Sequence, residues 1–353
     1  GLRTVIGKDV DDVYISRVRA LCVQPELCRE MGKTMRIVYS PLNGSGNVPV
    51  RRILKEVGFE NVFVVPEQEK PDGSFPNHIP NPENEAAMQS ILDAVQESKA
   101  DLGIIFDTDV DRAGAVLSDG TELNRNRIIA MMAAILLREH PGTTIVTDSI
   151  TSSGLKEYIE KTLGGHHHRF KRGYRNVINE SMRLNREGHD SQLAMETSGH
   201  GALKENYFLD DGAYLVTRLL IELARAKKEG YTLESLIADL AEPAESKEFR
   251  MNILVPDFKA YGQKIIDELN VYAASQPGWS GAPDNFGGVR VNLDKAHGDG
   301  WFLLRLSLHD PLIPLNIESD SVGGVRQIAA ELAPFLRPFD QLDTSALLAF
   351  AGC

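Results

Sequence analysis

The sequence of 353 residues has little of what marks secreted, membrane-spanning or nucleic-acid-binding proteins. Its three cysteines, Cys22, Cys28 and Cys353, lack the spacing of metal ligands and are too few for a disulfide framework, so reduced thiols are expected. No apolar run approaches the roughly 20 residues that cross a membrane, and residues 1–12 lack the apolar core of a signal peptide. The net charge of −12 disfavours nonspecific binding to nucleic acid or anionic membranes. These absences predict a cytoplasmic protein with no nucleic acid and no membrane among its partners.

The residues that are present have the proportions of an ordinary globular protein, 42% hydrophobic and 25% charged. A chain of this length is expected to form two or three domains. From residue 36 onwards short β-rich runs alternate with helical patterns, which is typical of α/β layers. The run at residues 102–106 is apolar throughout, so it is predicted to be a strand buried on both faces. Further strands are expected at residues 36–39, 61–65 and 144–147. Helices are expected at residues 14–23, 50–57 (ending at Gly58), 81–95 (capped by Asn81) and 213–228 (ending at Gly230).

A weak internal repeat predicts two related α/β units. The residues Ile37, Val38, Ser45 and Gly46 recur at the same spacing as Ile145, Val146, Ser153 and Gly154. Beyond an expected linker at residues 241–246, helices are predicted at residues 258–269 and 322–335 and strands at residues 289–293 and 301–306. The predicted fold class is therefore α/β, with two similar three-layer α/β domains with mixed sheets followed by a smaller α+β C-terminal domain.

The strongest local signal for chemistry is a set of three carboxylates directly after the buried strand. Asp107, Asp109 and Asp111 bring like charges together, which is costly unless a cation neutralises them. Ligands that are all oxygen indicate a hard cation, Mg²⁺ or Ca²⁺. The pattern is not an EF-hand, because that loop needs glycine where Arg112 stands and glutamate where Ser118 stands. An exposed acidic turn is the alternative, but the position at the carboxyl end of a strand favours a metal site.

Two other polar segments are candidates for ligand binding. Glu196 and Ser198 lie on a glycine-containing loop, where a carboxylate and a hydroxyl could bind vicinal hydroxyl groups, although the segment could equally be an ordinary polar loop. Residues 171–174 (KRGY) could place cations and backbone N–H groups near a phosphate, or form a solvated basic turn. Residues 166–168 are three consecutive histidines. A solvated loop is predicted there rather than a metal site, because adjacent side chains diverge.

Four motifs in register give the chain a resemblance to a known family. Residues 107–112 (DTDVDR) are similar to the metal loop Asp-Gly-Asp-x-Asp-Arg of the α-D-phosphohexomutases, the phosphoglucomutase/phosphomannomutase family, with Thr108 in place of glycine. Residues 39–46 (YSPLNGSG) resemble the family's Tyr-Thr-Pro-Leu-His-Gly-Thr-Gly. Residues 71–76 (PDGSFP) and 80–83 (PNPE) match its Pro-Asp-Gly-x-Phe-Pro and Pro-Asn-Pro-Glu.

The resemblance implies a role for each candidate residue. Asp107, Asp109 and Asp111 would bind Mg²⁺, and Arg112 would assist catalysis. In the last part of the chain Arg305 and Ser307 match the family's phosphate loop Arg-x-Ser-Gly-Thr-Glu-Pro, where Gly, Thr and Glu have become Leu308, His309 and Asp310; His309 is expected to compensate as a donor. The implied substrate-binding residues are Glu196, Ser198 and His200 for the sugar, and Arg172, Gly173, Arg305, Ser307 and His309 for the remaining contacts.

The resemblance also implies a domain organisation and a mechanism. Residues 1–11 would be a remnant of the linker to an N-terminal domain, 12–139 a metal-binding domain, 140–244 a sugar-binding domain and 245–353 a phosphate-binding domain. The family's phosphorylated serine lies in a loop of the form Thr-Ala-Ser-His-Asn-Pro, which these residues do not contain. The expected partners are therefore a hexose phosphate, a hexose bisphosphate and the missing N-terminal domain of the same protein, and the chain by itself is expected to be inactive.

Two other functions compete with this interpretation. A haloacid-dehalogenase-type phosphatase has an apolar strand followed by Asp-x-Asp-x-Thr/Val, which residues 104–109 fit, but Asp111 stands where that motif needs threonine or valine. The other alternative is a non-catalytic module that binds a phosphosugar or a metal.

Overall fold

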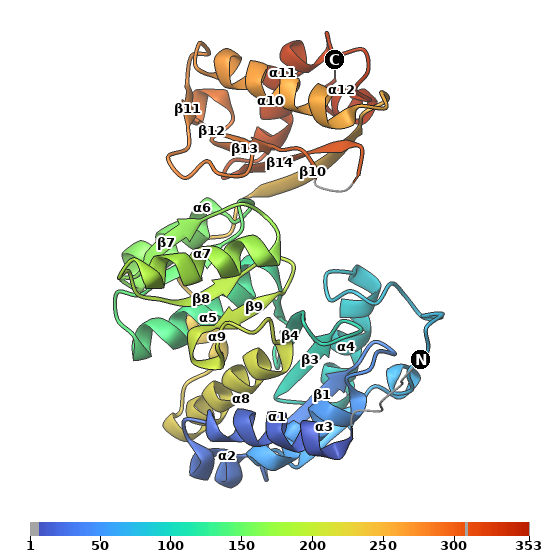
Figure 1. The fold of residues 1–353 in the computed structure, drawn as a ribbon, viewed down its shortest axis with the longest axis vertical. Coiled ribbons are helices and arrows are strands. Elements are labelled where there is room, and N and C mark those ends of the chain that lie inside the picture. The colour runs from blue at the N-terminus through green and yellow to red at the C-terminus, as the bar shows by residue number, and fades with distance from the viewer. Residues whose placement is uncertain (1–6, 308–309, 353) are drawn as a thin grey trace. The chain divides into compact units, whose positions relative to one another are not determined.

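Two mixed sheets and one antiparallel sheet make up the protein, for which a computed structural model describes residues 7–307 and 310–352 (Figure 1). The chain divides into two compact units. The first unit contains the described residues up to Asp148, with Glu157–His167 and Gly173–Leu240; the second contains Ser149–Lys156, His168–Arg172 and the described residues from Ala241 onwards. None of the described helices is long and apolar enough to span a membrane. The predicted α/β class with mixed sheets and a C-terminal sheet-containing domain is confirmed.

The first sheet has five strands in the order β2-β1-β3-β4-β5. Its first three strands are parallel and the last two pairings are antiparallel. All five residues of β3 are buried, as the continuous apolar run predicts. Gly103 faces Ile91 and Val95 of helix α4 (Glu85–Ser98) on one side of the sheet, and Phe106 approaches helix α8 (Gly212–Glu229) on the other. The strands are β1 (Arg36–Ser40), β2 (Asn61–Val64), β3 (Leu102–Phe106), β4 (Ala113–Leu117) and β5 (Glu122–Leu123).

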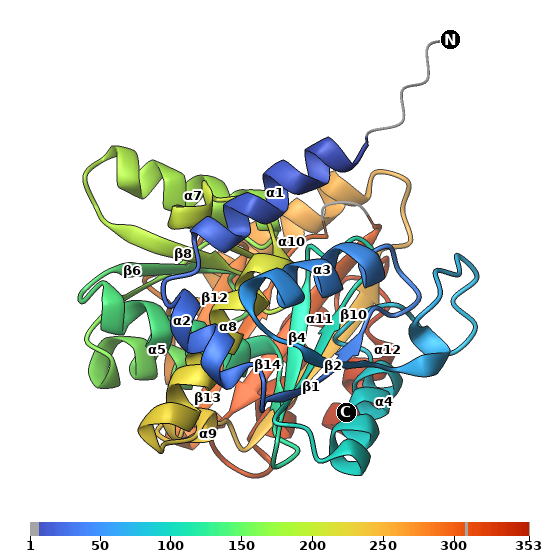
Figure 2. The same cartoon turned by 90° about the horizontal axis from the view of Figure 1, so that it is seen from below.

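Four helices in the first part of the chain flank this sheet or pack beside it. Helix α1 packs on α3, as both views show (Figure 2). The apolar face of α3 ends at Gly58, whose positive φ of 123° closes the helix. The predicted cap at Asn81 is wrong: Asn84 caps α4 by accepting from the backbone of Ala87, and Asn81 forms a local turn three residues earlier. The helices are α1 (Lys8–Ala20), α2 (Pro25–Met31), α3 (Asn47–Val57) and α4 (Glu85–Ser98).

The second sheet repeats the order of the first, β7-β6-β8-β9, with β6 and β8 parallel and β9 antiparallel. Helix α7 covers one face, and α5 and α8 pack against the other. The predicted solvated histidine loop is wrong, because these residues form β7, in which His167 is buried with Nε2 2.8 Å from Oγ1 of Thr147. The elements are β6 (Thr144–Thr147), β7 (His166–Arg169), β8 (Ser191–Met195), β9 (Gly201–Leu203), α5 (Arg125–Glu139), α6 (Ser153–Glu157), a π-helical turn (Tyr158–Thr162), α7 (Tyr174–Arg186), α8 (Gly212–Glu229) and α9 (Leu233–Leu236).

Helix α8 joins the two sheets of the first unit. It contacts both β4 and β9, and it ends at Gly230 in the left-handed conformation, as the sequence predicts. Fourteen of its residues are buried, including the charged Arg218 and Glu222. Both charges are paired, Glu222 with Arg138 of α5 and Arg218 with Glu139. A helix buried on nearly all sides fixes the two sheets against each other.

The second unit is built on an antiparallel sheet in the order β10-β14-β13-β12-β11. Helices α10 and α11 and the end of the chain pack on one face and enclose an apolar core. The predicted linker is too long by two residues, because strand pairing with β14 already begins at Glu245. The elements are β10 (Glu245–Asn252), β11 (Trp279–Gly281), β12 (Val289–Leu293), β13 (Gly300–Leu304), β14 (Leu312–Ser319), α10 (Phe258–Ala273), α11 (Gly324–Leu336) and α12 (Ser345–Ala351).

Two buried arginines explain why segments from the middle of the sequence belong to the second unit. Arg290 lies 3.5 Å from the ring centroid of Trp301 and donates from Nη1 to the backbone oxygens of Ser149 (2.8 Å) and Thr151 (3.1 Å). Arg169 pairs with Asp284 at 2.8 Å. Because buried guanidinium groups need all of these acceptors, residues 149–156 and 168–172 stay with the C-terminal sheet.

Candidate active site

Arg112 anchors the acidic loop that follows β3. Asp107 is 1% exposed; its Oδ1 accepts from the backbone N–H of Arg112 at 3.1 Å and its Oδ2 accepts from Nε at 2.8 Å. Two hydrogen bonds from one residue hold both oxygens of this carboxylate in place. Asp107 therefore fixes the conformation of the loop, while Asp109 at the tip of the loop is exposed to solvent.

The loop is held in a conformation that a β-branched residue rarely adopts. Val110 has a positive φ of 71°, and its carbonyl oxygen accepts from the N–H of Gly212 at the start of α8 at 3.0 Å. On the other side, a Cβ on Gly44 would lie only 2.6 Å from Cα of Thr108, and the N–H of Ser45 donates to the Thr108 carbonyl at 2.8 Å. The motif at residues 39–46 thus serves as a backbone scaffold for the acidic loop.

The three carboxylates form a candidate cation site. Each of Asp107, Asp109 and Asp111 offers an oxygen, and these atoms all lie within 4.8 Å of one another. Burial and then the charge of Asp107 raise the pKa of Asp111 to about 7, so full ionisation of the cluster is unfavourable without a cation. Oδ1 of Asp111 is buried and accepts no hydrogen bond within the described part of the chain. A hard divalent cation would satisfy that oxygen and neutralise the repulsion, so the residues fit Mg²⁺.

A histidine–aspartate pair lies beside the cation site. Nδ1 of His200 is 2.7 Å from Oδ2 of Asp210 and 3.7 Å from Oδ2 of Asp111, and its ring stacks on Tyr174 at 4.9 Å between centroids. Burial opposes protonation of His200, but the hydrogen bond and charge of Asp210, with the charges of Asp111 and Glu196, raise its pKa. A protonated His200 can donate a hydrogen bond to an anionic group near the loop.

The predicted sugar loop folds as a tight turn at the end of β8. Glu196 is 3% exposed, its Oε1 accepts from the N–H of Gly173 at 2.6 Å, and Oγ of Ser198 lies 3.5 Å from Oε2. Thr197 points the other way and donates to Asp148 at 2.7 Å. The structure therefore brings together Glu196, Ser198 and Gly173, the last at the start of α7.

The sugar loop is joined to the acidic loop through the backbone. Arg112 and His200 form an isolated antiparallel bridge, and the N–H of Ala113 donates to the carbonyl of Gly199 at 3.1 Å. Residues separated by some ninety positions in the sequence are thereby held next to each other. The predicted metal ligands and the predicted sugar-binding residues consequently share one site in the first unit.

Gly199 is required at this junction, which a matched pair of substitutions can test. A Cβ at residue 199 would lie 2.7 Å from the carbonyl oxygen of Ala113, whereas Gly188 has a similar positive φ of 88° with nothing within 4 Å. We expect Gly188→Ala to cost about 1–2 kcal/mol for the left-handed backbone, and Gly199→Ala to cost roughly 1–3 kcal/mol more because of the overlap. Chemical denaturation of both variants measures the difference; equal losses would show that the junction tolerates a side chain.

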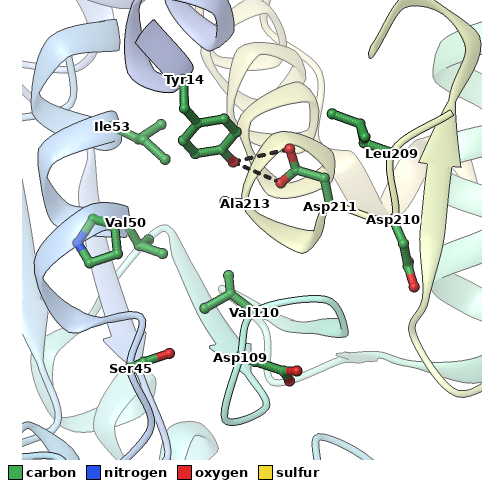
Figure 3. A pocket seen from close by; sticks show the side chains of 11 residues that line it. Tyr14, Ser45, Val50, Ile53, Asp109, Val110, Leu209, Asp210, Asp211 and Ala213 are labelled. Atoms are coloured by element: carbon green, nitrogen blue, oxygen red, sulfur yellow. Dashed lines mark hydrogen bonds between the residues drawn. The ribbon is translucent and has the colours of Figure 1, made fainter. Parts of the chain in front are cut away.

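A small pocket opens between α1, α3 and the acidic loop, as Figure 3 shows. Its volume is about 350 Å³, and its wall includes Val50, Val110 and Asp109. The hydroxyl of Tyr14 donates to both carboxylate oxygens of Asp211, at 3.0 Å each. Burial, with the neighbouring Asp211, raises the pKa of Tyr14, so this phenol remains a donor at neutral pH. Tyr14 thereby ties α1 to the start of α8, one residue from Asp210.

The predicted phosphate-binding residues belong mainly to the second unit. Arg305 and Ser307 lie in the turn that leaves β13, and their backbone N–H groups donate to Pro314 (3.2 Å) and Leu312 (3.1 Å). A Cβ at Gly288 would lie 2.9 Å from Cα of Arg305, and one at Gly287 would lie 3.7 Å from Cα of Lys171. The backbone at residues 287–288 therefore lies next to both basic segments, including the one that ends at Arg172. His309 lies outside the described residues.

Two family models match the chain, and together they match more than half of it. The model described as "Phosphoglucomutase/phosphomannomutase, alpha/beta/alpha domain II" matches residues 12–120, and the one described as domain III matches residues 124–243. The chain belongs to the phosphoglucomutase/phosphomannomutase family. The acidic loop lies in the match to domain II and the sugar loop in the match to domain III.

Similar proteins support this membership, and the chain spans only part of each of them. It is 31% identical over 301 residues to a phosphomannomutase/phosphoglucomutase of Pseudomonas putida and 29% identical over 302 residues to a phosphoglucomutase of Neisseria meningitidis. A crystal structure of a phosphoglucomutase/phosphomannomutase family protein from Burkholderia thailandensis has a TM-score of 0.75 at 26% identity, with 95% of this chain and 66% of that chain covered. The chain spans about 60% of the length of these curated relatives, and each match includes 85% of this chain.

Several residues of the candidate site are not evident from the sequence of this chain. Asp210 pairs with His200, Tyr174 stacks on it, and Gly212 holds the carbonyl of Val110. Tyr174 begins α7, whereas Asp210 and Gly212 lie at the start of α8. The one available signal was the Asp-Asp-Gly sequence at residues 210–212, directly before the long apolar helix.

Proposed function

We propose that this chain supplies the metal-binding, sugar-binding and phosphate-binding parts of a phosphohexomutase that interconverts a hexose 1-phosphate and a hexose 6-phosphate. The reaction would pass through a phosphoserine enzyme and a bisphosphorylated sugar. One observation carries the proposal: the junction of Arg112 with His200 joins the acidic loop to the Glu196 loop. A cation site directly beside a polyhydroxyl-binding loop suits transfer of a phosphoryl group to or from a sugar.

Each residue would have a separate task in binding. Mg²⁺ held by Asp107, Asp109 and Asp111 would neutralise charge on the transferring phosphoryl group. Within the described residues, the side chain of Arg112 donates a hydrogen bond only from Nε, to Asp107, so its terminal N–H groups would donate to a phosphoryl oxygen. The carboxylate of Glu196 and the hydroxyl of Ser198 would bind sugar hydroxyls, and such contacts permit the sugar to bind in two orientations.

The phosphate that does not react would bind mainly to residues of the second unit. We propose Arg172, Gly173, Arg305 and Ser307, with His309, as its binding residues, within domains that span residues 12–139, 140–244 and 245–353 after a short segment at 1–11. The motive is the close approach of the backbone at residues 287–288 to the segments that carry Lys171 and Arg305. A cytoplasmic location remains a prediction.

The phosphatase alternative is less compatible with the acidic loop. A haloacid-dehalogenase-type enzyme would need Asp107 as its nucleophile, yet both of its oxygens accept hydrogen bonds from Arg112. We therefore expect no release of inorganic phosphate from glucose 1-phosphate or mannose 1-phosphate in the presence of Mg²⁺. Steady release that disappears in Asp107→Asn would establish the phosphatase instead.

Replacement of Glu196 tests the sugar-binding role. Glu196→Gln keeps an oxygen that can accept from Gly173, so the fold is expected to persist, but the amide accepts hydroxyl hydrogen bonds more weakly. Because hydrogen bonds to charged groups contribute about 1.5–3 kcal/mol, we expect affinity for glucose 1-phosphate to fall by about tenfold or more in calorimetry with Mg²⁺. The control is Glu97→Gln, an exposed residue of α4 with the same change of charge. A metal- or phosphosugar-binding module without catalysis would show the same loss of affinity for glucose 1-phosphate. Only an assay of turnover distinguishes such a module from a mutase.

A further inference from the structure

Two cysteines near the N-terminus, Cys22 and Cys28, have their thiol groups in contact with each other. Sγ of Cys22 and Sγ of Cys28 are 3.7 Å apart, and the two residues are 7% and 0% exposed. Both are free thiols. Cys22 follows the end of α1, and Cys28 lies in the middle of α2. A disulfide has an S–S distance of about 2.05 Å, so the sulfurs need to approach by less than 2 Å.

One partner is fixed and the other has room to adjust. Helix α2 packs backbone to backbone on the end of α3, because a Cβ on Gly58 would lie 3.0 Å from the carbonyl carbon of Cys28 and one on Gly32 would lie 2.0 Å from the carbonyl oxygen of Gly58. Cys22 lies in the short connection between α1 and α2, outside both helices. A change of its side-chain rotamer can therefore bring its sulfur to Cys28 without moving α2.

The two thiols have different reactivities. The hydrogen bond from the Cys28 thiol, with the Gln24 backbone and the charge of Arg218, lowers the pKa of Cys22 to about 7 against the effect of burial. The hydrogen bond to Cys22 and burial raise the pKa of Cys28. The thiolate is the nucleophilic form of cysteine, so Cys22 is the group that reacts first with an oxidant.

We propose that Cys22 and Cys28 form a reversible redox site, with a small peroxide such as hydrogen peroxide as its oxidant. The Cys22 thiolate attacks one peroxide oxygen, the O–O bond breaks, and hydroxide leaves as Cys22 becomes a sulfenic acid. The Cys28 sulfur, on losing its proton, then attacks the Cys22 sulfur and displaces the hydroxyl as water. Two thiols and one hydrogen peroxide thus give one disulfide and two waters, and a dithiol reductant reverses the change.

Peroxide treatment followed by mass spectrometry tests the proposal. The chain has three cysteines; we expect two of the three thiols to disappear, with the loss of two hydrogens and a disulfide-linked peptide pair that contains Cys22 and Cys28. The variant Cys353→Ser should behave in the same way, and dithiothreitol should restore both thiols. Cys28→Ser should stop at a sulfenic acid on Cys22 that dimedone traps, and Cys22→Ser should show neither change.

Three results would overturn the redox site. One is an unchanged thiol count at peroxide concentrations that oxidise free cysteine. Another is a disulfide that includes Cys353. The third is oxidation of Cys22 to the sulfinic acid in the unsubstituted chain without loss of the Cys28 thiol. Because these readouts do not depend on mutase activity, they are independent of the function proposed above.

Discussion

Replacing Asp109 by asparagine is expected to abolish the stabilisation of this chain by Mg²⁺. Asp109 is the exposed member of the acidic trio, and its side chain makes no hydrogen bond to any residue that the structure describes, whereas Asp107 anchors the loop through Arg112. Loss of Asp109 should therefore remove a ligand and a charge without unfolding the loop. Substitution of Asp107 would confuse loss of the ligand with loss of the anchor.

The expected size of this effect follows from linkage between binding and folding. A cation that binds only the folded chain stabilises it by about 2.7 kcal/mol when its concentration is 100 times the dissociation constant. Denaturant unfolding of the unsubstituted chain and of Glu97→Gln should show such a gain on addition of Mg²⁺, and Asp109→Asn should show almost none. If Asp109→Asn gains as much as Glu97→Gln, the trio is an ordinary acidic turn and the cation binds elsewhere.

The second large effect concerns turnover by the 353 residues themselves. We expect no mutase activity with glucose 1-phosphate, Mg²⁺ and a glucose bisphosphate primer in an assay coupled to oxidation of glucose 6-phosphate. The sequence contains no loop of the form Thr-Ala-Ser-His-Asn-Pro, so no serine in it matches the family's phosphorylated nucleophile. The cation and sugar-binding residues can position a phosphosugar, but positioning without a phosphoryl donor does not complete the reaction.

The similar phosphomannomutase/phosphoglucomutase of Pseudomonas putida provides the positive control for this assay. Sustained turnover by this chain would show that one of its own serines is the nucleophile, and mass spectrometry after incubation with the bisphosphate would identify the phosphorylated residue. Binding of glucose 1-phosphate without turnover is the result expected here.

Local sequence patterns determined several elements of the fold in advance. The uninterrupted apolar run at residues 102–106 predicted a strand buried on both faces, and Gly58 and Gly230 predicted the ends of α3 and α8. These predictions succeed because periodicity and glycine conformation act over a few residues. The prediction of a solvated loop at residues 166–168 was wrong because it considered only local sequence. These residues pair with β6 as a strand, which buries His167 in spite of its polar neighbours.

The candidate site likewise has residues that the sequence predicted and contacts that only the tertiary structure showed. Spacing alone predicted a cation site at Asp107, Asp109 and Asp111, because alternate carboxylates repel one another whatever the fold around them. Family motifs then indicated Glu196 and Ser198. That the two loops touch was decided only by the tertiary structure, since the bridge between Arg112 and His200 depends on how two sheets pack on α8.

The sequence by itself determined which chemical groups this protein has: three carboxylates at alternate positions, a carboxylate and a hydroxyl on a glycine-containing loop, and basic side chains. Only the tertiary structure decided which groups act on one another. It paired His200 with Asp210, held Val110 in a left-handed conformation through Gly212, and placed Cys22 beside Cys28. The physical reason is that a residue's type and local spacing set its charge and donor groups, whereas its partners are set by packing between elements far apart in the chain.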